Sequence, residues 1–155
     1  MLFSFKMFAG KKPIYVCRPL INKNDIRIWA GSQGFNTTCE DMHVTEAFSK
    51  TPIKWSSIKE DNNIVKVFDT HMEVKKFGDA YVLAFKSQDL ENRFRYFRNA
   101  GCSYEHGEYN PHITISYREP KKDIKDIKPF IGSLQFGPEK FEKLDNNWKA
   151  KIKEI

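Results

Sequence analysis

The same succession of elements occurs in both halves of the chain: a strand, a helix that ends at a glycine, a loop, and a strand carrying the pattern His-x-Thr. In the first half Gly34 precedes His43 by nine residues, and in the second half Gly101 precedes His112 by eleven. A matched order of elements at comparable spacing is typical of an internal duplication. The chain is therefore expected to form one α+β domain of two similar lobes, with helices outside and antiparallel strands of both lobes lining a central cleft.

The strands are predicted from apolar runs bounded by turn-forming residues. These runs lie at residues 13–20, 42–48, 64–74, 80–85, 111–117, 134–136 and 140–144. We expect the last two to pair with each other. Gly78 marks a hairpin, and a loop that contains a proline is expected over residues 51–63.

Two helices are predicted where apolar residues recur at i, i+3 and i+4. They cover residues 24–33 and 87–99. Asn22 or Asn24 is expected to cap the first helix, and Ser87 the second, because short polar side chains satisfy the free N–H groups of a first turn. Each helix ends at a glycine, which suits a left-handed C-terminal residue.

A length of 155 residues suits one ordinary domain. We therefore treat residues 1–155 as a single domain, with one lobe at about 13–75, the other at about 76–145, and a short C-terminal tail. Hydrophobic residues make up 40% of the chain and include thirteen Phe. That is enough apolar mass for a core, and it excludes an intrinsically disordered protein.

The net charge indicates the class of partner, and the cysteine content indicates the cellular compartment. Twenty-six Lys and Arg against twenty Asp and Glu give a net charge of +6, which favours an anionic partner but is too small for a protein that coats DNA. Three Cys without metal-binding spacing are typical of reduced cytosolic thiols. The apolar start, residues 1–12, is broken by Lys6 and is too short for a secretory or membrane segment. We expect a small soluble intracellular protein.

The chemistry is carried by the segments MHVTEAF and PHITISY. Side chains at i and i+2 of a strand share one face, so His43 and Thr45 lie side by side, as do His112 and Thr114. If the two halves meet at a cleft, one imidazole can act as general base and the other as general acid, while the hydroxyls donate to an anionic oxygen. For either histidine alone, a structural role is as good an explanation. The matched pair on two predicted strands favours catalysis.

The chain resembles the 2H phosphoesterases, which have two such motifs on facing strands of a duplicated fold. Several blocks resemble one branch of that superfamily, the phage anti-CBASS nucleases that destroy cyclic oligonucleotide second messengers. The blocks are RPLINKNDIRIWAGSQGF, MHVTEAFSKTPIKW, FGDAYVLAF, YNPHITISY and FGPEKFEKLDNNW, and the resemblance covers roughly residues 14–148.

The resemblance implies that His43 and His112 are the catalytic pair and that Thr45 and Thr114 orient the phosphate. It implies cleavage of a 3′–5′ bond in a cyclic di- or trinucleotide without metal or other cofactor. The steps implied are attack by the ribose 2′-hydroxyl, a 2′,3′-cyclic phosphate intermediate, and hydrolysis to a 3′-phosphate. The implied partner is the cyclic oligonucleotide, and the implied location is the cytoplasm of an infected bacterium. We expect no stable binding of duplex DNA or RNA and no membrane association, and protein partners stay open.

Four further residues are candidates for substrate binding. Glu142 and Trp148 resemble base-contacting residues of the family, since an indole can stack on any base and a carboxylate can accept from an exocyclic amine. Both could equally be surface or packing residues. Tyr15 can stack on a base or fill the core, and Lys50 can reach a phosphate or remain a solvated surface lysine.

Other histidines give weaker signals. His71 and Glu73 share a strand face, but two ligands do not make a metal site, and His106 is expected on the surface.

Two functional alternatives stay open. One is another 2H activity, such as opening 2′,3′-cyclic phosphates or acting on 2′–5′ linked RNA like a ligase. The other is a non-catalytic sponge that sequesters the cyclic nucleotide.

Overall fold

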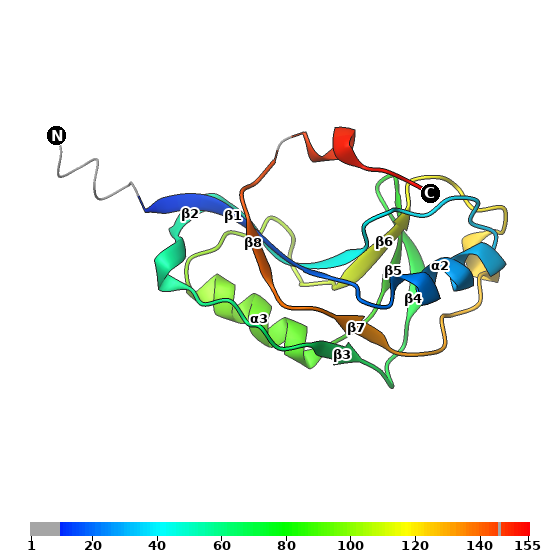
Figure 1. The fold of residues 1–155 in the computed structure, drawn as a ribbon, viewed down its shortest axis with the longest axis horizontal. Coiled ribbons are helices and arrows are strands. Elements are labelled where there is room, and N and C mark those ends of the chain that lie inside the picture. The colour runs from blue at the N-terminus through cyan, green and yellow to red at the C-terminus, as the bar shows by residue number, and fades with distance from the viewer. Residues whose placement is uncertain (1–9, 146) are drawn as a thin grey trace.

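A computed structural model of the protein describes residues 10–145 and 147–155 (Figure 1). The expectation for the apolar N-terminal segment falls mostly on residues 1–9, which lie outside the described residues. Among the helices that are described, none is long and apolar enough to cross a membrane. The chain forms a mixed α+β structure with antiparallel sheets, which confirms the predicted class.

Six strands form one open sheet in the order β4-β5-β6-β2-β1-β8, with antiparallel pairing throughout. They are β1 (Lys11–Pro19), β2 (His43–Lys54), β4 (Glu73–Phe77), β5 (Ala80–Ala84), β6 (His112–Ser116) and β8 (Lys140–Glu142). A second sheet pairs β3 (Val65–Val67) with β7 (Leu134–Phe136).

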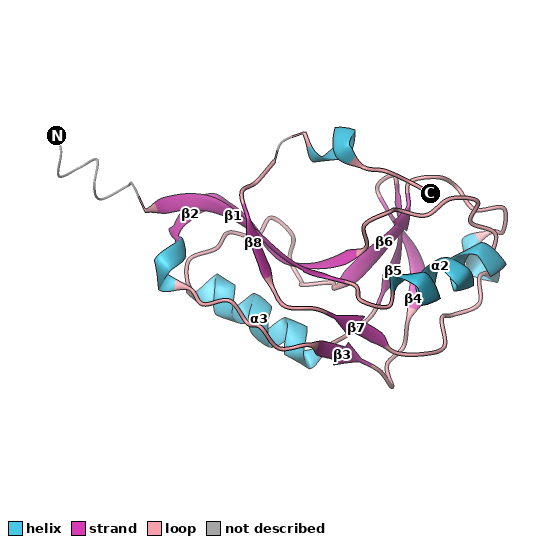
Figure 2. Cartoon of the chain, viewed as in Figure 1, coloured by secondary structure: helices cyan, strands magenta, loops and turns pink. Residues whose placement is uncertain are grey.

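Two α-helices, α2 (Lys23–Ser32) and α3 (Gln88–Asn99), lie at opposite ends of the molecule (Figure 2). Short 3₁₀ helices occur at Trp55–Ser57, Ile124–Asp126 and Trp148–Lys151. The C-terminal segment crosses on the side away from α3 (Figure 1). In each half a helix connects two paired antiparallel strands: β1, α2 and β2 in the first half, and β5, α3 and β6 in the second.

Of the two N-terminal caps and two C-terminal glycines predicted for the helices, the structure confirms three. Ser87 Oγ accepts a hydrogen bond from the N–H of Leu90 at 3.3 Å, as predicted for a cap. Gly34 and Gly101 have φ angles of 99° and 106°, the left-handed region in which glycine carries no steric penalty. Asn22 stands at the cap position of α2, but its side chain binds the main chain of Ser133 and Gln135 and so ties α2 to β7.

Two predicted strand arrangements are wrong. Residues 134–136 and 140–144 do not pair with each other, because β7 pairs with β3 and β8 with β1. Gly137 separates them and donates its N–H to the carbonyl of Pro19 at 2.9 Å, which redirects the chain from one sheet to the other. The run 64–74 forms two strands instead of one, since Asp69 takes a φ of 52° and turns the chain between β3 and β4.

The predicted loop over residues 51–63 begins too early. β2 continues to Lys54, where it pairs with Lys11 of β1. Pro52 has no N–H to give to a sheet, and it is tolerated because it falls in the register shift between the pairs Ile14–Ser49 and Lys12–Ile53.

The core consists of two groups of buried apolar side chains. The larger joins α2 to the centre of the sheet and includes Ile26, Leu83 and Ile113, each fully buried. The smaller lies under α3, where Phe97 packs among residues that include Val16. Each helix is therefore fixed to the sheet by its own apolar face.

A β-bulge in β2 directs a carboxylate into this interior. Val16 of β1 pairs with Ala47, whereas the next residue, Cys17, pairs with Thr45, so Glu46 is the extra residue of β2. Glu46 is 1% exposed. It accepts a hydrogen bond from Nε of Arg18, which is fully buried.

Glu46 belongs to a cluster of two cations and three acids. Arg18 also binds Asp61 Oδ2 at 2.7 Å and lies 3.4 Å from Glu139 Oε2. Arg93 of α3 binds the same Glu139 carboxylate at 2.7 Å. One proton on the acids makes this cluster neutral, which the cost of buried net charge favours.

Glu46 is the acid that holds this proton. Its burial, together with the neighbouring Glu139 carboxylate, raises the pKa of Glu46 from 4.5 to about 9. Burial alone would raise the pKa of Glu139, but its hydrogen bond and ion pair with Arg93 outweigh this effect, and the pKa of that carboxyl is lowered. The unfolded chain therefore loses the Glu46 proton near pH 4.5, while the folded protein keeps it up to about pH 9. Within this window the contribution of Glu46 to stability falls as pH rises.

Glu46→Gln imitates the protonated carboxyl and should remove this pH dependence. We expect the variant to gain stability over the parent as pH rises from 5 to 9, with a slope no steeper than about 1.4 kcal/mol per pH unit, the limit for one proton. Urea denaturation at several pH values measures the difference. Glu60→Gln, which removes an exposed carboxylate, is the control. A Glu46→Gln difference that stays constant or declines with pH would contradict a neutral Glu46.

Candidate active site

The two His-x-Thr segments meet at the centre of the large sheet. β2 and β6 are adjacent and antiparallel, and their one assigned pair is Val44 with Ile113, both fully buried. Continuing this register by one residue in each direction places His43 opposite Thr114 and Thr45 opposite His112. Directly opposed residues have Cβ atoms about 4.5–5.5 Å apart. The four side chains therefore share one face, around a local twofold axis.

A cavity of about 560 Å³ opens over this face. It is lined by all four motif residues and by three of the predicted substrate-binding residues: His43, Thr45, His112, Thr114, Tyr15, Glu142 and Trp148. The structure thus brings seven of the eight candidates together.

Lys50 lies elsewhere. It lines a neighbouring hollow of about 420 Å³ together with Lys12 and Lys143. Its Nζ is 3.0 Å from Oε1 of Glu105, and both side chains are largely exposed. The two hollows share Lys143, so Lys50 is near the cavity without lining it.

The imidazole of His112 is fixed in one tautomer. Its Nδ1 lies 2.8 Å from the carbonyl oxygen of Asn110, and because a carbonyl can only accept, Nδ1 carries the proton. The neutral ring therefore keeps the lone pair on Nε2 for proton transfer. Phe77 packs against this ring with centroids 5.0 Å apart. Burial lowers the pKa of His112, and the Asn110 hydrogen bond opposes this shift.

His43 lies in a similar environment. Its ring packs edge-on against Tyr15 with centroids 6.1 Å apart. Burial lowers the pKa of His43, and the charge of Asp41 partly compensates. The proximity of His112 lowers it further. Both imidazoles are therefore biased towards the neutral form, and each disfavours protonation of the other.

Tyr15 makes a polar contact with the first motif. Its hydroxyl is 2.8 Å from Oγ1 of Thr45. Burial raises the pKa of Tyr15 well above its ordinary value, so the phenol stays protonated and can donate to Thr45. Thr45 then keeps its own O–H for a ligand. The ring of Tyr15 also packs against Phe48. These contacts show how Tyr15 positions the motif, beside any contact that it makes with a base.

Sequence reasoning missed three aromatic residues of the cavity, which are Phe77, packed on His112, and the pair Phe48 and Tyr117. Phe48 and Tyr117 both line it, and each follows the threonine of its motif by three residues. The longer pattern His-x-Thr-x-x-aromatic therefore occurs in both halves and was a signal for them. In the first motif the bulge at Glu46 restores Phe48 to the cavity face.

The C-terminal segment forms the other wall of the cavity, through residues between Glu142 and Lys153. The chain end is anchored by two hydrogen bonds of 2.8 Å between the main chains of Thr38 and Ile155. Nζ of Lys149 lies 3.7 Å from Oδ2 of Asp79, which connects the segment to the turn between β4 and β5.

The remaining histidines do not line the cavity, and the charge of His106 contributes to the lowered pKa of His112. His71 lies 3.5 Å from Glu73 in an exposed pair. His106 packs its ring against Tyr104 in the loop before β6. Within the residues that the structure describes, no three His, Cys, Asp or Glu side chains gather in an arrangement that could hold a metal ion.

Comparison with known proteins identifies the family. The family model described as anti-CBASS protein Acb1 matches residues 12–151. Anti-CBASS protein Acb1 of Caulobacter sp. (strain RHG1) is 37% identical across 94% of this chain and 25% of its own length. The Sphingomonas paeninsulae protein of the same name is 37% identical across 91% of this chain and 24% of its own length. That of Enterobacteria phage T4 is 30% identical across 50% of this chain and 51% of its own length.

This chain spans about a quarter of the length of the first two relatives. The family model covers nearly all of the chain, including both His-x-Thr motifs and most of the C-terminal wall of the cavity. The chain belongs to the anti-CBASS protein Acb1 family.

Proposed function

We propose that this chain is a metal-independent phosphodiesterase that cleaves 3′–5′ bonds of cyclic di- or trinucleotide second messengers. In this proposal it acts in the cytoplasm of an infected bacterium and lets a phage evade CBASS immunity. Membership of the anti-CBASS family supports the biological role. The observation that carries the chemistry is the register of β2 and β6, which gathers two imidazoles and two threonine hydroxyls in one cavity.

The fold of the proposal is the duplicated 2H phosphoesterase fold. Its support is the repeated order of strand, helix and motif strand, with the two motif strands as antiparallel neighbours. A twofold axis between adjacent antiparallel strands gives each histidine the same relation to the threonine of the other motif. A phosphate on this axis has one imidazole on each side, as in-line displacement requires.

In the first step one neutral imidazole takes the proton of a ribose 2′-hydroxyl. The 2′ oxygen bonds to phosphorus, the bond from phosphorus to the 5′ oxygen breaks, and the other imidazole, protonated, gives its proton to the 5′ oxygen. Thr45 and Thr114 donate to the phosphoryl oxygens as their negative charge grows. In the second step the roles are exchanged. Water attacks phosphorus, the bond to the 2′ oxygen breaks, and a 3′-phosphate is released.

Substrate recognition is assigned to the wall opposite the motifs. Trp148 lines the cavity and is 43% exposed, which leaves an aromatic face for a base. Glu142 is exposed and pairs through its main chain with Tyr15, so its carboxylate is at the rim of the same cavity. A carboxylate there can accept from the N6 amine of adenine.

Replacing either catalytic histidine should abolish most of the activity. We expect His43→Ala and His112→Ala each to lower kcat on a cyclic dinucleotide by about two to four decades while binding persists, because proton transfer is lost and the cavity remains. Chromatography of the products in the presence of EDTA measures this. His71→Ala, in an exposed pair with Glu73 outside the cavity lining, is the control.

The same assay distinguishes the alternatives. Full activity of the double variant His43→Ala, His112→Ala would refute the assignment, and so would an activity that EDTA abolishes and zinc or manganese restores. Binding of the ring without products would indicate a sponge. Cleavage restricted to 2′,3′-cyclic phosphates or 2′–5′ bonds would indicate another 2H activity.

The pH dependence follows from the two imidazoles. Catalysis needs one neutral and one protonated ring, and burial lowers the pKa of both below the ordinary value of 6.5. We expect kcat/KM, which reports the free enzyme, to be bell-shaped with its maximum below pH 6.5. The acid limb reflects protonation of the base, and the alkaline limb reflects deprotonation of the acid. A kcat/KM that still rises above pH 7.5 would contradict this assignment.

The two recognition residues should differ in their substrate dependence. Trp148→Ala should weaken binding of every ring by about 1–3 kcal/mol, the size of one stack, and Trp148→Phe should restore most of it. Glu142→Ala should cost about 1–3 kcal/mol for adenine rings and little for the same rings built with purine, which lacks the amine. Calorimetry measures binding for the four combinations of the two alanine variants with the adenine and the purine ring. Equal losses for adenine and purine rings would remove Glu142 from base recognition.

A further inference from the structure

We propose that Tyr109 is a positioning residue that holds the two motif strands in their catalytic arrangement. This inference rests on the proposed function, since it concerns the geometry of the same histidines. Tyr109 lies in the loop before β6, and its hydroxyl donates to the carbonyl oxygen of Thr45 at 2.7 Å. It thereby connects the second half of the chain to the main chain of the first motif.

The next residue acts on the second motif. The carbonyl of Asn110 accepts the Nδ1 proton of His112 at 2.8 Å. Two successive residues of one loop therefore bind Thr45 and His112, which the register places opposite each other. A displacement of this loop changes both the orientation of the imidazole and its distance from the first motif.

Few ladder hydrogen bonds join the two motif strands at this point. Val44 and Ile113 are the one pair assigned between β2 and β6, whereas β1 and β2 are paired along eight positions. Relative movement of the motif strands is thus opposed by few ladder hydrogen bonds. The bond from Tyr109 to Thr45 adds a directed contact across the same junction.

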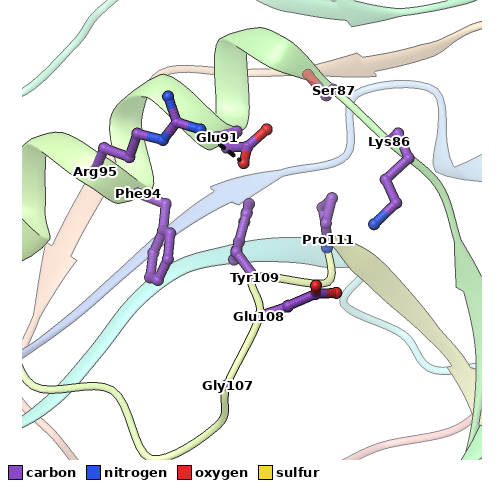
Figure 3. Close-up of a pocket in the computed structure, with 9 residues that line it drawn as sticks. All are labelled: Lys86, Ser87, Glu91, Phe94, Arg95, Gly107, Glu108, Tyr109 and Pro111. Atoms are coloured by element: carbon purple, nitrogen blue, oxygen red, sulfur yellow. Dashed lines mark hydrogen bonds and ion pairs between the residues drawn. The ribbon is translucent and has the colours of Figure 1, made fainter.

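The loop is also loosely packed on its outer side. A cavity of about 340 Å³ separates it from the first turns of α3, and Figure 3 shows Phe94 of the helix beside Tyr109 of the loop. Their rings stack with centroids 4.7 Å apart and planes inclined by 18°. The stack, the hydroxyl bond and the packing of Tyr109 against the larger core together fix its position. Burial raises the pKa of its phenol far above 10, so the hydroxyl remains a donor at working pH.

Tyr109→Phe tests the role directly, because it keeps the ring and the stack and removes only the donor. We expect kcat on a cyclic dinucleotide to fall about tenfold, with KM changed less than twofold, since misplacement affects the reacting geometry more than binding. Tyr96→Phe is the matched control. Tyr96 lies on α3, and its hydroxyl accepts a hydrogen bond from the N–H of Lys59 at 2.9 Å, so the variant also removes one bond to the main chain, at a place outside the cavity and outside the loop before β6.

A second readout does not depend on turnover. In NMR spectra of the whole chain, the ring signals of His43 and His112 should shift in Tyr109→Phe and stay unchanged in Tyr96→Phe. Unchanged kcat and unchanged signals in Tyr109→Phe would overturn the proposal, as would equal losses in both variants. A parent protein that cleaves no ring would refute the proposed function instead, and the histidine signals would still decide whether Tyr109 positions the motifs.

Discussion

The contact between Val44 and Ile113 is the constraint on which the candidate site depends. It joins two groups of three strands, β4-β5-β6 and β2-β1-β8, at the centre of the sheet. Both side chains are fully buried, so a slip of one residue would expose them and turn both motifs inwards. The hydrophobic core on one face of the sheet therefore sets the register of β2 and β6. That register in turn decides which motif side chains meet on the cavity face.

The two faces of β2 place ionisable side chains in different surroundings. On the core face the bulge buries Glu46 against Arg18, and the proton held by Glu46 keeps the cluster of acids and arginines neutral. On the cavity face His43 and Thr45 are partly exposed, and burial keeps the imidazole neutral. Loss of Glu46 would leave Arg18 without its partner in β2 and disturb the strand that carries the first motif.

Much of the site was predictable because it depends on local patterns. The alternation in MHVTEAF and PHITISY indicates which side chains share a face, and Gly34 and Gly101 have the left-handed φ expected of helix ends. Strand pairing was not predictable, because residues 134–136 and 140–144 have similar β propensity and Gly137 sends them to different partners. The hollow occupied by Lys50 and the anchoring of the chain end at Thr38 arise from tertiary contacts that no local pattern specifies.

The two walls of the cavity contribute different groups to the proposed reaction. The motif wall offers two imidazoles biased to the neutral form, which attract an anion weakly. The C-terminal wall contributes Lys143, Lys149, Lys151 and Lys153, and Lys149 pairs with Asp79 and Lys151 with Asp145 of the same lining. In the proposed reaction, a phosphodiester bound in the cavity brings a negative charge next to both histidines, and a nearby opposite charge favours protonation of an imidazole. Because each histidine disfavours protonation of the other, one gains the proton and the second stays neutral. In the proposed reaction, substrate binding therefore favours one protonated and one neutral imidazole, the pair that general acid–base catalysis needs.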